Sequence, residues 1–327
     1  MTTSAYAIEA VGLVKRFGDK TALGGVSFEV PAGTVCGLLG PNGAGKTTAV
    51  RILTTLSRPD AGSARVAGID VLAAPGEARK VLGLAAQDAT VDALLTGREN
   101  LTMIGELHHL GRRVAKARAD ELLEQFSLAD AGRRLVKTYS GGMRRRLDLA
   151  ATLVARPEVL FLDEPTTGLD PRARNELWDV LETLVDEGAT ILLTTQYLEE
   201  ADRLADDIVV VDHGSVIARG DARSLKRQVG GAQLFATAVD ADRLEEVRAH
   251  VARVAGAEST ADPESRTAQA PTEAGPRAVS ALADALADDG VEVDDIGLRQ
   301  PTLDDVFLTL TGTAIAAADE EPVEVTR

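Results

Sequence analysis

The chain has 327 residues, of which 45% are apolar and 26% charged, and its 51 acidic and 35 basic side chains give a formal net charge of −16. This composition is typical of a folded protein, and no stretch reaches the ~18 consecutive apolar residues of a membrane-spanning helix. A pI near 4.8 argues against a basic face that binds nucleic acid. The single cysteine excludes an internal disulfide, and residues 1–10 lack the features of a secretion signal, so we expect a cytosolic protein.

The charge is unevenly distributed along the chain. Residues 256–327 carry 16 acidic and 4 basic side chains, whereas residues 1–255 carry 35 and 31. A length of ~100–200 residues per domain predicts two domains. We place the first at residues 1–220 and the second at 221–312, followed by a disordered acidic tail at 313–327.

The first part of the chain alternates between strand and helix signals. Short strands are predicted at 7–14, 27–30 and 34–39, with Gly-Gly and Pro-Ala-Gly between them. A glycine-rich turn at 40–48 then leads into a helix at 49–56, which stops before Pro59. Residues 92–155 lack a strand pattern, and 112–128 has helical spacing, so we expect a helical insertion over about 90–155.

The second half of the first domain returns to short apolar strands. The pattern predicts a strand from Val159, a helix at 172–187, a strand at 190–196, a helix at 198–205 and a strand at 207–212, closed by a hairpin strand at 214–221. Such alternation indicates a parallel sheet with helices on both faces. Beyond 221 we expect a short α+β region, interrupted by a linker at 255–277, with helix-then-strand spacing at 279–298 and a capped helix at 301–312.

The strongest motif is GPNGAGKT at residues 40–47, which satisfies G-x-x-x-x-G-K-[ST] between a strand and a helix. Its glycines allow backbone N–H groups to surround phosphate oxygens at a helix N-terminus. Lys46 would bridge the β and γ phosphates, and the Thr47 hydroxyl would ligate Mg²⁺.

Two weaker patterns gain meaning beside this loop. Asp163 and Glu164 end an apolar strand; alone they could be solvated loop residues, but together with a phosphate loop one carboxylate can organise Mg²⁺ and the other can polarise water. Ser140, Gly141 and Gly142 open a helix that we expect to run to residue 156. Alone they could form an ordinary cap, yet they also leave the helix N-terminus open to an anion.

This ordered set resembles the nucleotide-binding subunits of ATP-binding-cassette (ABC) transporters, and most closely the daunorubicin-resistance-type exporter ATPases. The resemblance covers residues 6–220 and extends more loosely to the end of the chain through LDDVFLTLTG. It implies an α/β P-loop NTPase with a β-rich N-terminal subdomain and a helical insertion, joined to a small α+β C-terminal domain.

The resemblance also implies roles for single residues. Phe17 would stack on adenine, Gln87 would touch Mg²⁺ and relay the nucleotide state to a membrane subunit, and Asp170 would cross a dimer interface. Thr47, Gln87 and Asp163 would hold Mg²⁺, with Asp163 acting through water. The implied ATP-binding residues are Phe17, Gly40, Pro41, Asn42, Gly43, Ala44, Gly45, Lys46, Thr47, Thr48, Gln87 and, from the opposite protomer, Ser140, Gly141 and Gly142.

Two positions depart from the family pattern. Tyr139 and Met143 replace the ends of the usual Leu-Ser-Gly-Gly-Gln signature, but its anion-binding centre is intact. Gln196 stands where a histidine is usual; its amide can donate a hydrogen bond but cannot take up a proton. We therefore expect slow hydrolysis with Glu164 as the base, assisted by Lys46 and Gln196.

The function that this resemblance implies is ATP hydrolysis, with Mg²⁺, in an exporter of a hydrophobic drug, antibiotic or lipid-like metabolite. The chain would form a head-to-tail homodimer at the cytoplasmic face of a bacterial membrane, bind a separate multi-span permease through residues 88–110, and bind no nucleic acid. Two other classes stay open: a soluble cassette ATPase acting on ribosomes or DNA, and a nucleotide-gated regulator without transport.

Several other residues have ordinary structural interpretations. Cys36 is expected to be a small buried apolar residue, and Trp178 with its leucine neighbours to pack in the core. The spacing of the histidines indicates no structural zinc site. The run Arg144–Arg146 is expected to form a solvated face, with proximity to nucleotide or a membrane subunit as the alternative.

Overall fold

The computed structural model describes residues 6–86, 90–229 and 231–311. These residues form two compact units, one ending at Ala222 and the other beginning at Arg223. Each unit has its own sheets and its own apolar core.

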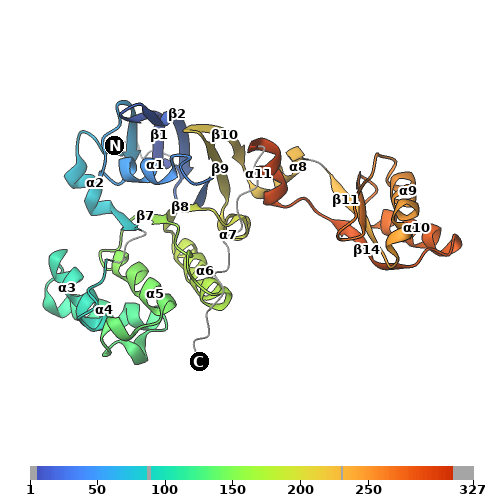
Figure 1. Cartoon of the computed structure of the whole chain (residues 1–327). Helices are drawn as coiled ribbons and strands as arrows, with labels where there is room; N and C mark the ends of the chain where they lie inside the picture. Colours follow the sequence, from blue (N-terminus) through green and yellow to red (C-terminus); the bar gives the residue numbers. More distant parts are fainter. Residues whose placement is uncertain (1–5, 87–89, 230, 312–327) are drawn as a thin grey trace. The chain divides into compact units, whose positions relative to one another are not determined.

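The first unit contains two sheets (Figure 1). One is antiparallel with the order β2-β1-β4-β5, and the other has the order β10-β9-β3-β8-β7-β6, in which only β10 runs antiparallel to its neighbour. The strands are β1 (Tyr6–Phe17), β2 (Lys20–Pro31), β3 (Val35–Leu39), β4 (Ala61–Val66), β5 (Ile69–Asp70), β6 (Leu82–Ala85), β7 (Val159–Asp163), β8 (Thr190–Thr195), β9 (Asp207–Asp212) and β10 (Ser215–Gly220). The predicted parallel sheet is thus confirmed.

Helices cover both faces of the parallel sheet, and each face has a separate core. In one core, α1 and the antiparallel sheet pack against Phe161 and Leu192 of the parallel sheet. In the other core, α3–α6 pack against Leu160 and Leu193, which neighbour those residues along the strands and point to the opposite face. The helices are α1 (Lys46–Leu53), α2 (Pro75–Val81), α3 (Gly97–Leu107), α4 (Arg112–Gln125), α5 (Gly141–Thr152), α6 (Pro171–Asp186) and α7 (Leu198–Leu204), with short 3₁₀ turns at Ala129–Ala131 and Val136–Thr138. The range 90–155, for which a helical insertion is predicted, contains α3, α4 and α5, and Figure 1 shows these helices gathered together.

Two boundaries differ from the prediction. The α5 helix ends at Thr152 and not at residue 156, because Leu153 and Val154 donate to carbonyls only three residues back, and Arg156 has a positive φ of 52°. Gly24 and Gly25, expected to separate two segments, lie inside the continuous strand β2, where the N–H of Gly24 donates to the Gly214 carbonyl at 2.7 Å.

The second unit contains a four-stranded antiparallel sheet of order β12-β13-β11-β14. Together with α9 and α10 its strands follow the chain order βαββαβ of a ferredoxin-like module. Five of the twelve buried residues in its core are alanines, and none is aromatic. The elements are α8 (Ala222–Val229), β11 (Ala232–Ala238), a 3₁₀ turn (Ala241–Arg243), α9 (Leu244–Ala255), β12 (Thr260–Asp262), β13 (Thr267–Thr272), α10 (Pro276–Asp288), β14 (Val293–Arg299) and α11 (Leu303–Thr311).

The linker predicted at 255–277 is wrong, because this stretch contributes β12 and β13 to the sheet. Ala268 and Ala270 point into the core, while Gln269 and Pro271 alternate with them on the exposed side. Small and polar residues on a half-covered strand lack the large apolar side chains by which strands are recognised. Pro271 also lies beyond the three-residue pairing with β12, at an open edge where proline is tolerated.

The closing helix was predicted correctly. Thr302 and Asp305 exchange reciprocal hydrogen bonds at the start of α11, in the manner of a capping box. Within the residues described, no helix is both long enough and apolar enough to cross a bilayer.

Candidate functional site

The glycine-rich loop runs from the end of β3 into α1. At Gly45, which has a φ of 111°, an added Cβ would lie 2.5 Å from the Ala22 carbonyl oxygen and 2.7 Å from Leu23, so only glycine fits. Gly43 has a φ of 84°, and a Cβ added there would approach only Lys20 Nζ, at 4.0 Å. No side chain caps α1, and the first N–H groups of a helix have no partner inside it, so those of Lys46 and Thr47 are available to an anion.

Lys46 lies across this loop and not out in solvent. Its side chain is buried, and Nζ donates to the carbonyl oxygens of Gly40 at 2.7 Å and Pro41 at 3.1 Å. Burial lowers the pKa of Lys46 from its usual value, while the carboxylates of Glu164 and Asp163 act to raise it. The Lys46 ammonium therefore interacts electrostatically with Glu164, the predicted base, and with Asp163, the predicted magnesium-organising residue.

Asp163, at the end of β7, is joined to the phosphate loop. Its Oδ1 accepts hydrogen bonds from Thr47 Oγ1 at 3.3 Å and from Thr194 Oγ1, which lies on the neighbouring strand β8. The adjacent strands β7 and β8 thus present a buried carboxylate and a hydroxyl to the first turn of α1. The fold thus brings together Thr47 and Asp163, two of the residues predicted to hold Mg²⁺.

This donor set fits Mg²⁺. The described residues contain no group of three or more His, Cys, Asp and Glu side chains that could hold a metal by themselves. Magnesium in nucleotide sites is usually held by one or two carboxylates together with substrate phosphates and water, so a full protein cage is not needed. Asp163 and Thr47 supply one carboxylate and one hydroxyl for such an ion.

Glu164 follows Asp163 in a strained backbone conformation. Its φ is 50°, a region that costs a residue other than glycine about 1–3 kcal/mol and persists only where neighbours hold it. The N–H of Glu164 donates to both the carbonyl oxygen of Thr194, at 3.0 Å, and its hydroxyl, at 3.1 Å. With this φ, the backbone at Glu164 leaves the extended conformation of β7, which ends at Asp163.

The signature residues open α5. Ser140 caps the helix by accepting a hydrogen bond from the N–H of Met143 at 3.2 Å; Gly141 is exposed, with open space where a Cβ would lie. A Cβ on Gly142 would lie 3.1 Å from Ala173. Among the described residues no hydrogen bond joins 140–142 to the phosphate loop of the same chain.

A cavity of about 380 Å³ lies beside this helix. Gly141, Glu164 and Thr167 all line it, so the carboxylate predicted to act as the base and the start of α5 share one surface. Asp170, in the loop that follows, caps α6 by accepting from the N–H of Ala173 at 2.8 Å. The N-cap residues of α5 and α6, Ser140 and Asp170, are therefore both exposed.

The remaining predicted residues are more scattered. Phe17, at the end of β1, is 56% exposed, and Lys15 Nζ lies 5.4 Å from the centre of its ring. Gln196 is half-buried directly after β8. Gln87 lies outside the described residues.

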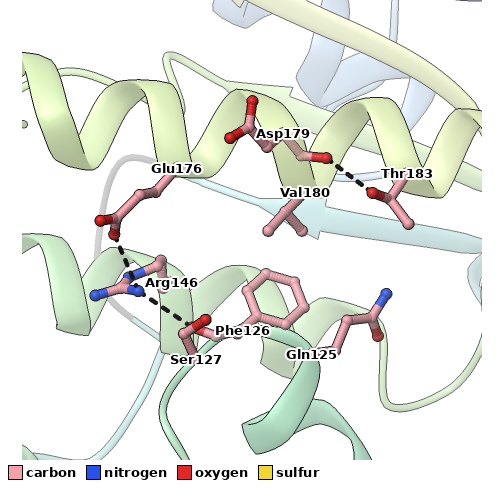
Figure 2. A pocket seen from close by; sticks show the side chains of 8 residues that line it. All are labelled: Gln125, Phe126, Ser127, Arg146, Glu176, Asp179, Val180 and Thr183. Carbon is pink, nitrogen blue, oxygen red and sulfur yellow. Dashed lines mark hydrogen bonds and ion pairs between the residues drawn. The ribbon is translucent and has the colours of Figure 1, made fainter.

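The three arginines of α5 point in three directions, because a helix turns by about 100° per residue. Arg144 is exposed, as expected for a solvated face. Arg146 lies 3.3 Å from Glu176 of α6 and donates to the Phe126 carbonyl, beside a cavity of about 280 Å³ that contains no predicted site residue (Figure 2). Arg145 donates to the turn after β7, and the side chain of Arg146 is only 15% exposed, so the solvated-face interpretation is wrong for both.

Sequence reasoning missed two residues of this site. Thr194 holds both Asp163 and the N–H of Glu164, and the only sequence signal was a hydroxyl at the end of an apolar strand. Arg145 donates to carbonyls on either side of Glu164, and burial lowers the pKa of its guanidinium, while Asp148 and Asp163 act to raise it. The sequence alone does not show which of the three consecutive arginines, Arg144–Arg146, contacts this turn.

The structural interpretations of Cys36 and Trp178 are confirmed. Cys36 is fully buried, and burial raises the pKa of its thiol. Trp178 and its neighbours Leu177, Leu181 and Leu184 are all buried.

Known proteins share both the sequence and the fold of this chain. The sequence profile of the ABC transporter family matches residues 23–167. The chain is 56% identical to the daunorubicin resistance ATP-binding protein DrrA2 of Streptomyces coeruleorubidus, over 94% of this chain and 95% of that protein. It is 48% identical to the daunorubicin/doxorubicin resistance ATP-binding protein DrrA of Streptomyces peucetius, over 98% and 99%.

A solved structure supports the same assignment. The ATP-binding subunit of an ABC transporter superimposes with a TM-score of 0.62 at 27% identity, covering 68% of this chain and 92% of that one. The two Streptomyces proteins match nearly the whole length, so the likeness includes the second unit. The chain belongs to the ATP-binding subunits of ABC transporters, within the daunorubicin/doxorubicin-resistance (DrrA-type) group of exporter ATPases.

Proposed function

We propose that this chain binds ATP with Mg²⁺ on the loop at residues 40–48 and hydrolyses it with Glu164 as the general base. The observation that carries the proposal is the junction of Asp163, Thr47 and Lys46. A carboxylate, a hydroxyl and a buried ammonium converge where the N-terminus of α1 offers free N–H groups. This is the combination that phosphoryl transfer requires, since it depends on positioning and charge neutralisation.

Each residue has a separate task in this proposal. Lys46 and the loop N–H groups bind phosphate oxygens, and Asp163 and Thr47 hold the metal, which when bound neutralises charge on those oxygens. Glu164 accepts the proton of the attacking water. Gln196 donates a hydrogen bond to the terminal phosphate but moves no proton. Phe17, exposed at the end of β1, stacks on the adenine ring.

The second half of each site comes from another copy of the chain. Ser140, Gly141 and Gly142 form a helix N-terminus that, in the part of the chain the structure describes, makes no hydrogen bond to the loop of its own chain. A head-to-tail homodimer would place this N-terminus against the γ phosphate bound by its mate, with Asp170 at the interface. The exposed cap position of Asp170 supports this arrangement.

The energy of hydrolysis would serve export through a separate multi-span permease at the cytoplasmic face of a bacterial membrane. The names of the two Streptomyces relatives point to resistance against daunorubicin and doxorubicin, so we propose a hydrophobic drug, antibiotic or lipid-like metabolite as the cargo. The pI near 4.8 argues against a nucleic-acid partner.

The docking surface for the permease would lie in residues 88–110. Within this stretch, Leu94 is 72% and Leu107 69% exposed, more than large apolar side chains usually are. Leu94→Glu and Leu107→Glu should abolish co-purification with the permease, and Val11→Glu, at an exposed apolar residue of β1, serves as the matched control. Intact complexes with both leucine variants would refute this surface.

Steady-state phosphate release tests the hydrolytic roles. Glu164→Gln should lower kcat by about 10²–10⁴-fold, the typical contribution of a general base. Gln196→Ala should have a smaller effect, because it removes one hydrogen bond. Glu182→Gln makes the same chemical change on the exposed side of α6 and should leave kcat unchanged. Full turnover by Glu164→Gln would remove the proposed mechanism.

A further inference from the structure

Arg145 makes more backbone contacts than its position on a helix requires. Its guanidinium donates to four carbonyl oxygens: Nη1 to Ala86 at 2.7 Å, Nε to Pro165 at 2.8 Å, and Nη2 to Glu164 at 3.0 Å and Asp163 at 3.1 Å. Three of these acceptors belong to the consecutive residues 163–165, and the fourth, Ala86, directly follows the neighbouring strand β6. One side chain of α5 thus binds the whole turn that follows β7.

Few side chains could make this set of bonds. Four carbonyl oxygens that converge at a half-buried point need several donors spread over a plane, which the fork of an arginine provides. A lysine ammonium is a compact point charge and can reach fewer of these acceptors. This position therefore requires the shape of the guanidinium group and not only its positive charge.

The turn that Arg145 binds is the strained one. Glu164 has a φ of 50°, and Thr194 holds its N–H while Arg145 holds its carbonyl oxygen. The peptide groups on both sides of the Glu164 Cα are thus fixed. Its side chain leaves the backbone in a direction that these two residues determine.

A second residue of α5 strengthens the connection. Asp148, one turn after Arg145, is buried and accepts hydrogen bonds from the N–H groups of Thr90 at 2.8 Å and Val91 at 3.2 Å. Arg145 binds the carbonyl of Ala86. The same helix that begins with the signature residues is therefore bonded both to the catalytic turn and to residues 86, 90 and 91.

We propose that Arg145 is a positioning residue for hydrolysis, which holds the backbone of Glu164 on α5 so that its carboxylate meets the attacking water. This inference rests on the proposed function, since it assigns the base role to Glu164. It predicts that Arg145 acts on the chemical step and not on nucleotide affinity, because none of its bonds involves the phosphate loop.

The test compares Arg145→Gln and Arg145→Lys in the full chain by kcat, KM and equilibrium ATP affinity. Arg145→Gln should lower kcat by about 10–100-fold, as misplacement of a reacting group does, with ATP affinity changed less than about threefold. Arg145→Lys should recover part of the kcat, because it keeps the charge and some of the bonds. Arg118→Gln is the matched control, since Arg118 also donates to a carbonyl, that of Leu153, but away from the site.

A double variant separates positioning from a general structural role. If Arg145 acts through Glu164, adding Arg145→Gln to Glu164→Gln should lower kcat no further. Equal losses of kcat and ATP affinity in Arg145→Gln, or the same loss of kcat in Arg118→Gln, would overturn the inference. Full activity of Arg145→Gln while Glu164→Gln is inactive would overturn it and leave the proposed function standing, whereas an active Glu164→Gln would refute the proposed function itself.

Discussion

The indole N–H of Trp178 donates to Glu200 Oε1 at 3.2 Å and so joins α6 to α7 inside the apolar core. Glu200 is fully buried, and within the described part of the chain its second oxygen has no hydrogen-bond partner. Burial raises the pKa of Glu200, an effect only partly opposed by the neighbouring Thr195 hydroxyl and by the indole N–H of Trp178. A carboxyl in this environment favours the protonated form.

Replacing Glu200 by Gln should therefore stabilise the protein at neutral pH. Because the pKa is raised in the folded state, the native protein loses stability as pH rises above the ordinary value of 4.5, by up to about 1.4 kcal/mol per pH unit until the folded pKa is reached. The amide keeps the Trp178 bond and has no such dependence. Thermal unfolding from pH 4 to 9 measures the difference, with Glu199→Gln on the exposed face of α7 as control. A lower Tm for Glu200→Gln at pH 8 would contradict the prediction.

The phosphate loop should distinguish sharply between two of its glycines. Gly45→Ala must push a Cβ against a backbone oxygen 2.5 Å away, whereas a Cβ at Gly43 would approach only Lys20 Nζ, at 4.0 Å, although both glycines have a positive φ. We expect Gly43→Ala to cost about 1 kcal/mol and Gly45→Ala more than about 3 kcal/mol, measured by denaturant unfolding. Equal losses would show that the loop can move away from Ala22.

Metal dependence should report on Thr47. Thr47→Val removes the hydroxyl that lies 3.3 Å from Asp163 but keeps the size of the side chain. The Mg²⁺ concentration at half-maximal phosphate release should rise by about 10-fold or more, with little change in Tm, since the group contributes one ligand to the ion. Thr183→Val, which makes the same change at an exposed threonine of α6 outside the phosphate loop, is the control. An unchanged Mg²⁺ requirement would exclude Thr47 as a ligand.

The first unit should bind ATP without the second. A chain ending at Ala222 retains both sheets of the first unit, the phosphate loop and α5. Its ATP affinity should stay within about threefold of that of the full chain, as measured by equilibrium binding. A truncated chain that folds cooperatively but binds no ATP would show that the proposed division of the chain is wrong.

Sequence patterns correctly predicted the parts of the fold that depend on residues close together in the sequence. The phosphate loop, the strand ending in Asp163 and the cap of α11 have fixed residue types at fixed spacings, and all three form as predicted. The strands at 260–262 and 267–272 failed this approach because their alanines, threonines and proline carry little strand signal. The strand at 267–272 depends on pairing with β11, about 30–40 residues earlier in the chain, and the strand at 260–262 pairs in turn with 267–269.

The same distinction holds for the site. Lys46, Thr47 and Asp163 could be named because each belongs to a motif, and Thr47 and Asp163 are hydrogen-bonded although 116 residues apart. Arg145 and Thr194 could not, since their role comes from contacts with backbone groups of distant segments. No pattern within α5 distinguishes the arginine that points to Glu164 from its two neighbours.

The alanine-rich core of the second unit has a consequence for the order in which the protein unfolds. Alanine loses no side-chain entropy on burial, but it buries little apolar area, so five alanines among twelve core residues leave this unit with a weak hydrophobic driving force. The first unit, by contrast, buries Phe28, Phe126, Phe161 and Trp178. On heating, we expect the βαββαβ module to lose its structure first, in a separate transition at lower temperature, while the nucleotide-binding unit remains intact.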